Sequence, residues 1–279
     1  PYPEETHKIC LNSDAVLFGA VGDPKYDNNP TAKVRPEEGL LRMRKELGLF
    51  ANIRPTYTFE SLLEKSPIKK SIIQGTDLVF VRELTGGIYF GKRGRNNAKD
   101  YAFDTCEYNV DEIKRLAKVG FELAMKRSKK LCCIDKANVL ETSRLWRQTV
   151  QSLEKNYPEV SVSYEFVDAV AMRLIHSPSY YDVLITSNLF GDILTDEASV
   201  ISGSMGLMPS ASVGTRTSIY EPIHGSFPQA KGKNIANPLA TILSASMMFE
   251  RSFNLLDESK LIRDLVNDSI VNNIVTEDL

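Results

Sequence analysis

Residues 181–202 read YDVLITSNLFGDILTDEASVIS. The first part, Tyr181 to Thr186, is a short run dominated by apolar side chains, with the length of a buried strand. The second part, 188–202, has the length and composition of a helix. A strand that leads directly into a helix is the repeating unit of α/β proteins. The stretch therefore predicts an α/β fold, with helices on the faces of a largely parallel sheet.

The alternation of strands and helices continues on both sides of this stretch. Further strands are predicted at 14–20, 77–82, 130–135 and 160–167, and further helices at 36–47, 109–126, 141–155, 169–176, 239–249 and 257–272. The helix at 109–126 has the clearest start, because Asn109 can cap it and Glu112 can complete a capping box. Two glycine-containing stretches interrupt the alternation. We predict a loop or an extended arm at 86–109, and a long binding loop at 202–238.

The composition excludes several classes of protein. The chain has 279 residues, 42% of them hydrophobic and 25% charged, which suffices for one large or two smaller domains with a packed core. A net charge of −2 leaves no surplus of positive charge for a nucleic-acid backbone. No apolar run approaches the roughly 20 residues of a membrane helix, and we find no signal peptide. We therefore expect neither a nucleic-acid nor a membrane partner.

The cysteines and the chain ends lead to two further expectations. Cys10, Cys106, Cys132 and Cys133 form no C-x-x-C pair, which favours free thiols in a reduced, cytoplasmic setting. The chain opens at Pro1-Tyr2-Pro3 without Met and stops shortly after a helical pattern. We therefore expect a fragment, or the ordered part, of a longer chain.

Three acidic residues are candidates for a metal site. Asp192 and Asp196 stand four positions apart, so a helix would place both carboxylates on one face, where like charges repel. A hard divalent ion such as Mg²⁺ takes oxygen ligands and would relieve this repulsion. Asp168 follows the strand at 160–167, and strand ends are favoured places for site residues. The alternative interpretation is a solvated acidic surface, which is common.

Three arginines from separate elements are candidates for binding a carboxylate substrate. Arg44 lies on the predicted helix 36–47, Arg54 follows it, and Arg82 ends the strand 77–82. The planar guanidinium group can bind a carboxylate through two parallel hydrogen bonds, so three together could hold a di- or tricarboxylate. Each alone could equally be a surface arginine.

Lys136 and Tyr89 could transfer protons, although a surface lysine and a packing tyrosine are equally compatible with the sequence. Nucleotide signals are indirect, because the chain has neither G-x-G-x-x-G nor G-x-x-x-x-G-K-[ST]. The loop 224–229, followed by 234–238 at a helix start, could hold an adenosine phosphate or could simply connect two elements.

Seven motifs together resemble one family. They follow one another almost from end to end: 20–25 (AVGDPK), 35–41 (RPEEGLL), 49–55 (LFANIRP), 81–91 (VRELTGGIYFG), 135–140 (DKANVL), 188–199 (NLFGDILTDEAS) and 221–226 (EPIHGS). By these motifs the chain resembles the isocitrate/isopropylmalate family of β-decarboxylating dehydrogenases, and within it the branch that acts on 3-isopropylmalate.

The resemblance implies a two-domain fold with a mixed central sheet, which is not a Rossmann fold. A discontinuous cofactor-binding domain would comprise 1–49 and 203–279, without the glycine-rich segment that opens the family. The second domain, 50–202, would carry the metal and substrate residues, the dimer interface and an arm near 91–109. The active site would be shared in a homodimer, with Lys136 and Asp168 reaching in from the partner chain.

The resemblance also implies a role for each candidate residue. Substrate contacts would come from Leu40, Arg44, Arg54, Arg82 and Asp168, and Mg²⁺ or Mn²⁺ ligands from Asp168, Asp192 and Asp196. Lys136 would help to remove the proton of the C2 hydroxyl, and Tyr89 would protonate the enolate. The NAD contacts would be Glu37, His224, Gly225, Gln229 and Asn237. NAD-specific members usually have an aspartate where this chain has Gln229, so weaker discrimination against NADP is expected.

The implied reaction is the oxidative decarboxylation of 3-isopropylmalate to 2-oxoisocaproate in leucine biosynthesis, with hydride transfer to NAD⁺. Leu40 favours this substrate over more polar acids, because a buried carboxylate that faced a leucine would be unpaired. The alternatives are a sister enzyme for D-malate, tartrate, homoisocitrate or isocitrate, an inactive regulatory subunit, and a generic metal- or phosphate-binding module.

Overall fold

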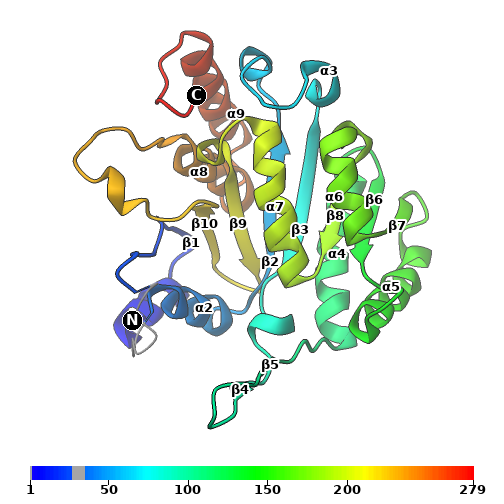
Figure 1. Ribbon diagram of the computed structural model, residues 1–279. Coiled ribbons are helices and arrows are strands. Elements are labelled where there is room, and N and C mark those ends of the chain that lie inside the picture. Colours follow the sequence, from blue (N-terminus) through cyan, green and yellow to red (C-terminus); the bar gives the residue numbers. More distant parts are fainter. Residues whose placement is uncertain (1, 27–34) are drawn as a thin grey trace.

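An eight-stranded sheet runs through the centre of the molecule (Figure 1). The computed structural model describes residues 2–26 and 35–279. The strand order is β1-β10-β9-β2-β3-β8-β6-β7. The strands are β1 (Ala15–Leu17), β2 (Leu49–Tyr57), β3 (Asp77–Glu83), β6 (Lys130–Asp135), β7 (Ser161–Phe166), β8 (Val183–Thr186), β9 (Pro209–Gly214) and β10 (Ser218–Pro222).

The sheet is mixed, as the family resemblance implied. The pairs β1–β10, β3–β8, β8–β6 and β6–β7 are parallel, whereas β10–β9, β9–β2 and β2–β3 are antiparallel. The alternation of strands and helices predicted a largely parallel sheet. This prediction is wrong for the part of the sheet from β10 to β3, where neighbouring strands are antiparallel. The predicted long binding loop at 202–238 is also wrong in part, because β9 and β10 lie within it.

Helices cover both faces of the sheet (Figure 1). They are α1 (Glu4–Leu11), α2 (Pro36–Glu46), α3 (Lys70–Ile73), α4 (Val110–Lys126), α5 (Glu141–Leu153), α6 (Val167–His176), α7 (Asn188–Ser202), α8 (Leu239–Ser252) and α9 (Leu256–Val271). On one face, α4 and α5 pack on a core that includes Ala51, and α8 packs beside Ile53. On the other face, α6 and α7 pack around Phe80, and α2 packs on Ile219.

The alternation of side chains along β2 places the polar residues of this strand on the second face. Successive residues of a strand point to opposite faces. Because Ala51 and Ile53 pack into the first face, Asn52 and Arg54 project from the second, between α2 and α7. The family resemblance implied one domain made of 1–49 with 203–279 and a second domain made of 50–202. The boundary between these two falls between β9 and β2, so the pairing of β9 with β2 joins the two sequence segments.

The stretch 86–109 contains a short 3₁₀ helix, Gly87–Tyr89, and a two-stranded hairpin of β4 (Arg93–Arg95) and β5 (Ala102–Asp104). The hairpin projects away from the rest of the molecule (Figure 1). Tyr101 and Phe103 are exposed on it. This hairpin has the form of an extended arm, which is one of the two structures predicted for this stretch.

The start of α4 agrees with the predicted capping box. Asn109 Oδ1 accepts hydrogen bonds from the backbone N–H groups of Asp111 and Glu112, at 3.0 Å each. Glu112 Oε2 accepts one from the backbone N–H of Asn109 at 2.9 Å. These bonds satisfy N–H groups that a helix otherwise leaves without partners at its first turn.

Replacing Asn109 by alanine is expected to lower the free energy of unfolding by about 1 kcal/mol, the usual cost of losing an N-cap. Urea unfolding followed by circular dichroism measures this change. Asn267→Ala, at an exposed site inside α9, is the matched control and should cost less. Equal losses in the two variants would contradict the capping role of Asn109.

Candidate active site

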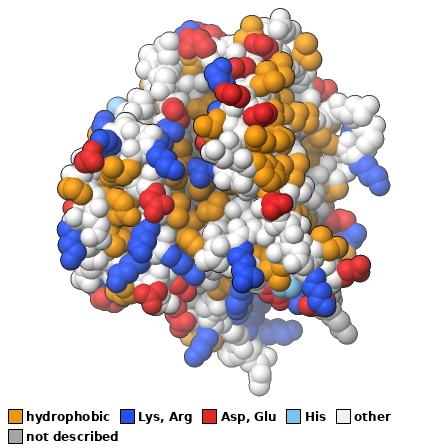
Figure 2. Space-filling view, turned by 180° about the vertical axis from the view of Figure 1, so that it is seen from behind, with side chains coloured by type: hydrophobic (Ala, Val, Ile, Leu, Met, Phe, Trp, Pro, Cys, Tyr) orange, Lys and Arg blue, Asp and Glu red, His pale blue; other side chains and the backbone are white. Residues whose placement is uncertain are grey.

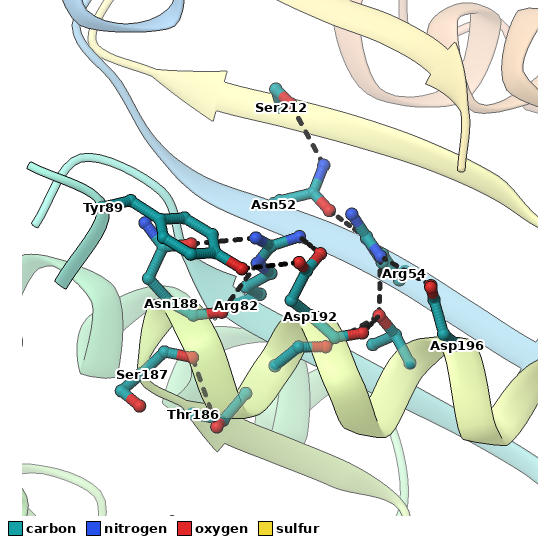
Figure 3. Close-up of polar contacts among 12 residues, drawn as sticks. Asn52, Arg54, Arg82, Tyr89, Thr186, Ser187, Asn188, Asp192, Asp196 and Ser212 are labelled. Atoms are coloured by element: carbon teal, nitrogen blue, oxygen red, sulfur yellow. Dashed lines mark hydrogen bonds and ion pairs between the residues drawn. The ribbon is translucent and has the colours of Figure 1, made fainter. Parts of the chain in front are cut away.

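Polar side chains form a row across the second face of the sheet. Ser212 of β9 pairs in register with Asn52 of β2, Asn52 with Arg82 of β3, and Arg82 with Thr186 of β8. All four residues are buried, and buried polar groups need hydrogen-bond partners. The partners in this row lie on neighbouring strands and on α7 (Figure 3).

Arg82 is held at the start of α7. Its Nε donates to the carbonyl oxygen of Asn188 and its Nη2 to Asn188 Oδ1, both at 2.9 Å. Its Nη1 donates to Asp192 Oδ1 at 2.5 Å (Figure 3). Gly191 allows this close approach, since a Cβ there would lie 2.6 Å from Arg82 Cγ. Burial lowers the pKa of Arg82, yet an arginine stays protonated at neutral pH.

Arg54 is fixed from two sides. Its Nε donates to Asn52 Oδ1 at 2.5 Å, and its Nη1 donates to Thr195 Oγ1 of α7 at 2.6 Å. Burial lowers the pKa of Arg54 to about 9, and the positive charges of Arg82 and Arg44 act in the same direction. Three cationic groups thus lie close enough to repel one another, and this arrangement suits an anionic ligand with more than one carboxylate.

Arg44 approaches the same region from α2. Its Nη2 donates to Glu221 Oε1 of β10 at 2.8 Å, and both side chains are largely buried. Arg44 Nε is buried without a hydrogen-bond partner among the described residues. An unpaired buried donor is costly, so this guanidinium has capacity to hold a further acceptor.

Tyr89 and the two aspartates of α7 lie beside these arginines. Tyr89 Oη donates to Asp192 Oδ2 at 2.8 Å, and the guanidinium of Arg82 lies 6.0 Å from the centre of the tyrosine ring. Partial burial raises the pKa of Tyr89 to about 12, and the hydrogen bond to Asp192 acts in the same direction. Tyr89 is therefore a protonated donor at neutral pH.

Asp196 lies one turn after Asp192, 3.9 Å from Arg54 Nη1. Burial raises the pKa of Asp196 and so does the charge of Asp192, whereas Arg54 opposes them. The side chains of Asp192 and Asp196 are 39% and 58% exposed, so their oxygens are accessible from solvent. Two oxygen donors on one helix face match the preference of Mg²⁺ and Mn²⁺.

Lys136 and Asp168 contact each other rather than this cluster. Lys136 Nζ donates to Asp168 Oδ1 at 2.5 Å, and this contact lowers the pKa of Asp168. In the described part of the chain, no group of three or more His, Cys, Asp and Glu side chains could hold a metal ion. A single chain therefore does not unite Asp168 with Asp192 and Asp196 in a metal site.

Leu40 and Glu37 lie on α2, the helix that also carries Arg44. Leu40 precedes Arg44 by one helical turn and lines an apolar cavity of about 430 Å³ with Phe18, Val21 and Met43. Glu37 is exposed, and its Oε1 lies 3.5 Å from the position that a Cβ on Gly22 would take.

The loop after β10 lies beside Gly22 as well. Ser226 Oγ donates to the carbonyl oxygen of Gly22 at 2.5 Å. His224 Nε2 is buried and has no hydrogen-bond partner within the described ranges. No described heavy atom lies within 4 Å of where a Cβ on Gly225 would stand, so a ligand could approach this backbone closely.

Gln229 and Asn237 lie further along this segment. Gln229 is exposed in a short 3₁₀ helix, Pro228–Ala230. Asn237 Oδ1 accepts a hydrogen bond from the N–H of Leu239 at 2.9 Å, as expected for a residue that starts α8. Its Nδ2 donates to Asp278 Oδ2 at 3.0 Å, so Asn237 also ties α8 to the segment after α9.

The sequence reasoning missed several residues that complete this cluster. Asn52, Thr195, Ser212, Glu221 and Asn188 all hydrogen-bond to the arginines or to one another. One available signal was the spacing of Asn52 and Arg54, two positions apart between apolar neighbours. On a strand this spacing places both on one face.

The face of the molecule opposite to that of Figure 1 carries side chains of both signs of charge. Figure 2 shows Lys and Arg interspersed with Asp and Glu on the side opposite to that of Figure 1, with a band of hydrophobic side chains between them. Among the described residues, no helix combines the length and the apolar character that a membrane span requires.

Comparison with known proteins identifies the family to which the whole chain belongs. The family model described as isocitrate/isopropylmalate dehydrogenase matches residues 1–279. The chain is 59% identical over 279 residues to a 3-isopropylmalate dehydrogenase from Bacteroides fragilis, covering 100% of this chain and 78% of the relative. It is 52% identical over 282 residues to the 3-isopropylmalate dehydrogenase of Aquifex aeolicus, covering 100% and 77%.

Solved structures agree with these matches. The isocitrate dehydrogenase of Methylococcus capsulatus superposes with a TM-score of 0.90 at 30% identity, covering 100% of this chain and 80% of that one. A β-decarboxylating dehydrogenase of Thermococcus kodakarensis gives a TM-score of 0.77 at 34% identity, covering 97% and 74%. The chain therefore belongs to the isocitrate/isopropylmalate dehydrogenase family.

Proposed function

We propose that the chain catalyses the oxidative decarboxylation of 3-isopropylmalate to 2-oxoisocaproate, a step of leucine biosynthesis, with NAD⁺ as the hydride acceptor. The relatives at 50–59% identity that carry the name 3-isopropylmalate dehydrogenase support this reaction. The observation on which the proposal rests is the convergence of buried Arg54 and Arg82 and the largely buried Arg44 beside two accessible aspartates and Tyr89.

The charges of this cluster and the apolar surroundings of Leu40 support this substrate. Arg44, Arg54 and Arg82 come from α2, β2 and β3 and would bind the two carboxylates of a malate. Leu40 lies one turn before Arg44 in an apolar environment and would contact the isopropyl group. An isopropyl group there gains free energy from burial, whereas a third carboxylate would lose its hydration without a charged partner.

The donor groups suit a divalent ion and a dinucleotide. Asp192 and Asp196 would supply oxygen ligands, and Asp168 of a second copy would complete the set. Glu37, His224, Gly225, Gln229 and Asn237 would contact NAD⁺, with the open backbone at Gly225 and the unpaired His224 Nε2 as supporting features. When bound, the divalent ion would act as a Lewis acid on the C2 oxygen and NAD⁺ would accept the hydride.

The chain's own residues would move the protons. Lys136 would help to remove the proton of the C2 hydroxyl. After CO₂ leaves, the adjacent carbon needs a proton. Tyr89 Oη carries one, because its raised pKa keeps the phenol protonated at neutral pH. Asp192 holds this hydroxyl in place through the 2.8 Å hydrogen bond.

The active site would be shared in a homodimer. Within one chain, Lys136 and Asp168 contact each other, so they would act in the site of a second copy. Exposed Met172 and Ile193 on α6 and α7, next to Asp168 and Asp192, offer an apolar surface for that copy.

All four cysteines are unpaired, which supports a reduced, cytoplasmic setting.

A substrate panel tests the proposed function. The full-length enzyme with Mg²⁺ and NAD⁺ should form NADH with 3-isopropylmalate in clear preference to isocitrate and D-malate. Leu40→Ser should lower kcat/KM for isopropylmalate by about tenfold or more, because burial of the isopropyl group against a leucine is lost. Leu261→Ser, at an exposed position on α9, is the control and should leave this preference unchanged.

Preference for another acid would keep the reaction type and assign the enzyme to a sister branch. Absence of turnover with every acid would contradict the proposed function and favour a regulatory role.

A further inference from the structure

A continuous series of hydrogen bonds joins two of the arginines through residues that no substrate would reach. Arg54 Nε donates to Asn52 Oδ1 at 2.5 Å, and Asn52 Nδ2 donates to Ser212 Oγ at 3.0 Å (Figure 3). Ser212 Oγ donates to Glu221 Oε1 at 3.5 Å. Glu221 Oε1 also accepts from Arg44 Nη2 at 2.8 Å.

The donors all point toward Glu221. Asn52 and Ser212 each accept one hydrogen bond from the side of Arg54 and donate one toward the carboxylate. Bonds aligned in this way polarise one another, and they do so more strongly in an interior of low dielectric. Asn52 and Ser212 are fully buried, with exposed fractions of 0%. Glu221 is therefore the direct counter-charge of Arg44, and two neutral side chains connect it to Arg54.

The register of the sheet explains why these side chains meet. Asn52 and Ser212 are directly paired across the antiparallel β2–β9 ladder. Arg54 follows Asn52 by two positions on the same face. The series therefore crosses the junction between the sequence segment 50–202 and the segment 203–279.

We propose that Asn52 and Ser212 are positioning residues that aim the guanidinium of Arg54 at the substrate carboxylate. This inference rests on the proposed function, because it assigns Arg54 to substrate binding. A guanidinium has five N–H donors, of which Asn52 and Thr195 engage two. Anchoring Nε and one Nη1 proton fixes the plane of the group and leaves its outer edge for a bidentate contact.

The proposal predicts a specific kinetic signature. Arg54 would bind the carboxylate in the ground state and in the transition state alike, so misplacing it raises KM more than it lowers kcat. A purely structural role would instead reduce the fraction of folded, active enzyme. That loss would lower kcat and leave KM unchanged.

The experiment compares Asn52→Leu, Ser212→Ala and the double variant in the full-length enzyme with Mg²⁺, NAD⁺ and the acid that wild type turns over best. Asn52→Leu should raise KM by about tenfold or more, since a hydrogen bond to a charged group is lost. Ser212→Ala should raise KM by roughly two- to fivefold, because it removes the next bond in the series. In the Asn52→Leu background, Ser212→Ala should have no further effect on KM.

Ser210→Ala is the matched control. Ser210 lies on β9 and is as buried as Ser212, but its hydroxyl donates to the backbone carbonyl of Glu221 and not to the series. This variant should leave KM within about twofold of wild type, as expected for a neutral bond outside the site. Calorimetric titration of the same acid into each variant gives the binding change independently of turnover.

Equal KM changes in Ser212→Ala and Ser210→Ala would overturn the proposal. So would additive effects of Asn52→Leu and Ser212→Ala, or a fall in kcat with KM unchanged. If Asn52→Leu fails to fold, the comparison of the two serine variants still decides the outcome. The substrate panel tests the reaction itself. A failure of the proposed function would appear there, in the preferred acid or in the absence of turnover. A failure of the positioning role would appear in the kinetic constants of the variants.

Discussion

Arg82→Met is expected to lower kcat/KM by about 10³-fold, because two charge-assisted hydrogen bonds to a carboxylate are lost and each contributes roughly 1.5–3 kcal/mol. Arg82 is almost fully buried and also holds both the backbone and the side chain of Asn188. Its removal leaves Asn188 Oδ1 and Asp192 Oδ1 without their present donor. Initial rates across a range of isopropylmalate concentrations measure the change.

The stability of the variant has to be measured beside its activity. Loss of a buried cationic partner also lowers the free energy of unfolding, although the 39% exposure of Asp192 moderates that cost. Arg263→Met is the control, because Arg263 pairs with Glu250 at the surface. If Arg82→Met kept wild-type kcat/KM while folded, the role of Arg82 in substrate binding would be wrong.

Asp192→Asn is expected to abolish most of the metal-dependent activity. The substitution keeps the shape of the side chain and can still accept a hydrogen bond, but it removes the negative charge that a hard cation requires. Adding Mg²⁺ at 100 times its Kd for wild type should raise the free energy of unfolding of wild type by roughly 2.7 kcal/mol. The same Mg²⁺ concentration should raise the free energy of unfolding of Asp192→Asn by much less. Thermal unfolding with and without Mg²⁺ measures this difference without relying on turnover.

A chelator provides the complementary test on wild type. EDTA should stop NADH formation, and excess Mg²⁺ or Mn²⁺ should restore it. Asp268→Asn, at an exposed site on α9, is the matched charge control and should keep the full response to Mg²⁺. An Asp192→Asn enzyme that Mg²⁺ stabilised as strongly as wild type would exclude Asp192 as a ligand.

Local sequence patterns determined much of the secondary structure. The strand at 130–135 and the helix at 188–202 were predicted with the bounds that the structure has, and the cap of α4 was predicted from Asn109 and Glu112. These features depend on neighbours within a few positions, so a periodic pattern or a capping residue is sufficient to find them. The order of motifs along the chain also identified the family before any contact was known.

The strands β2, β9 and β10 were not predicted, because their sequences lack a clear strand signal. β2 contains Asn52, Arg54 and Pro55, and β9 is composed of small residues. What makes them strands is their pairing with each other and with β3 in the assembled sheet. Strand propensity depends strongly on such context.

The sequence alone therefore determined the family, the helices other than α1 and α3, and the residue types needed for a carboxylate and a divalent ion. Only the tertiary structure decided which of these residues meet. It brought Asn52 to Ser212 across 160 positions and Arg44 to Glu221 across 177, and it left Lys136 with Asp168 instead of Asp192. Contacts of this kind follow from strand order and register, which depend on the packing of the whole sheet and not on any local pattern.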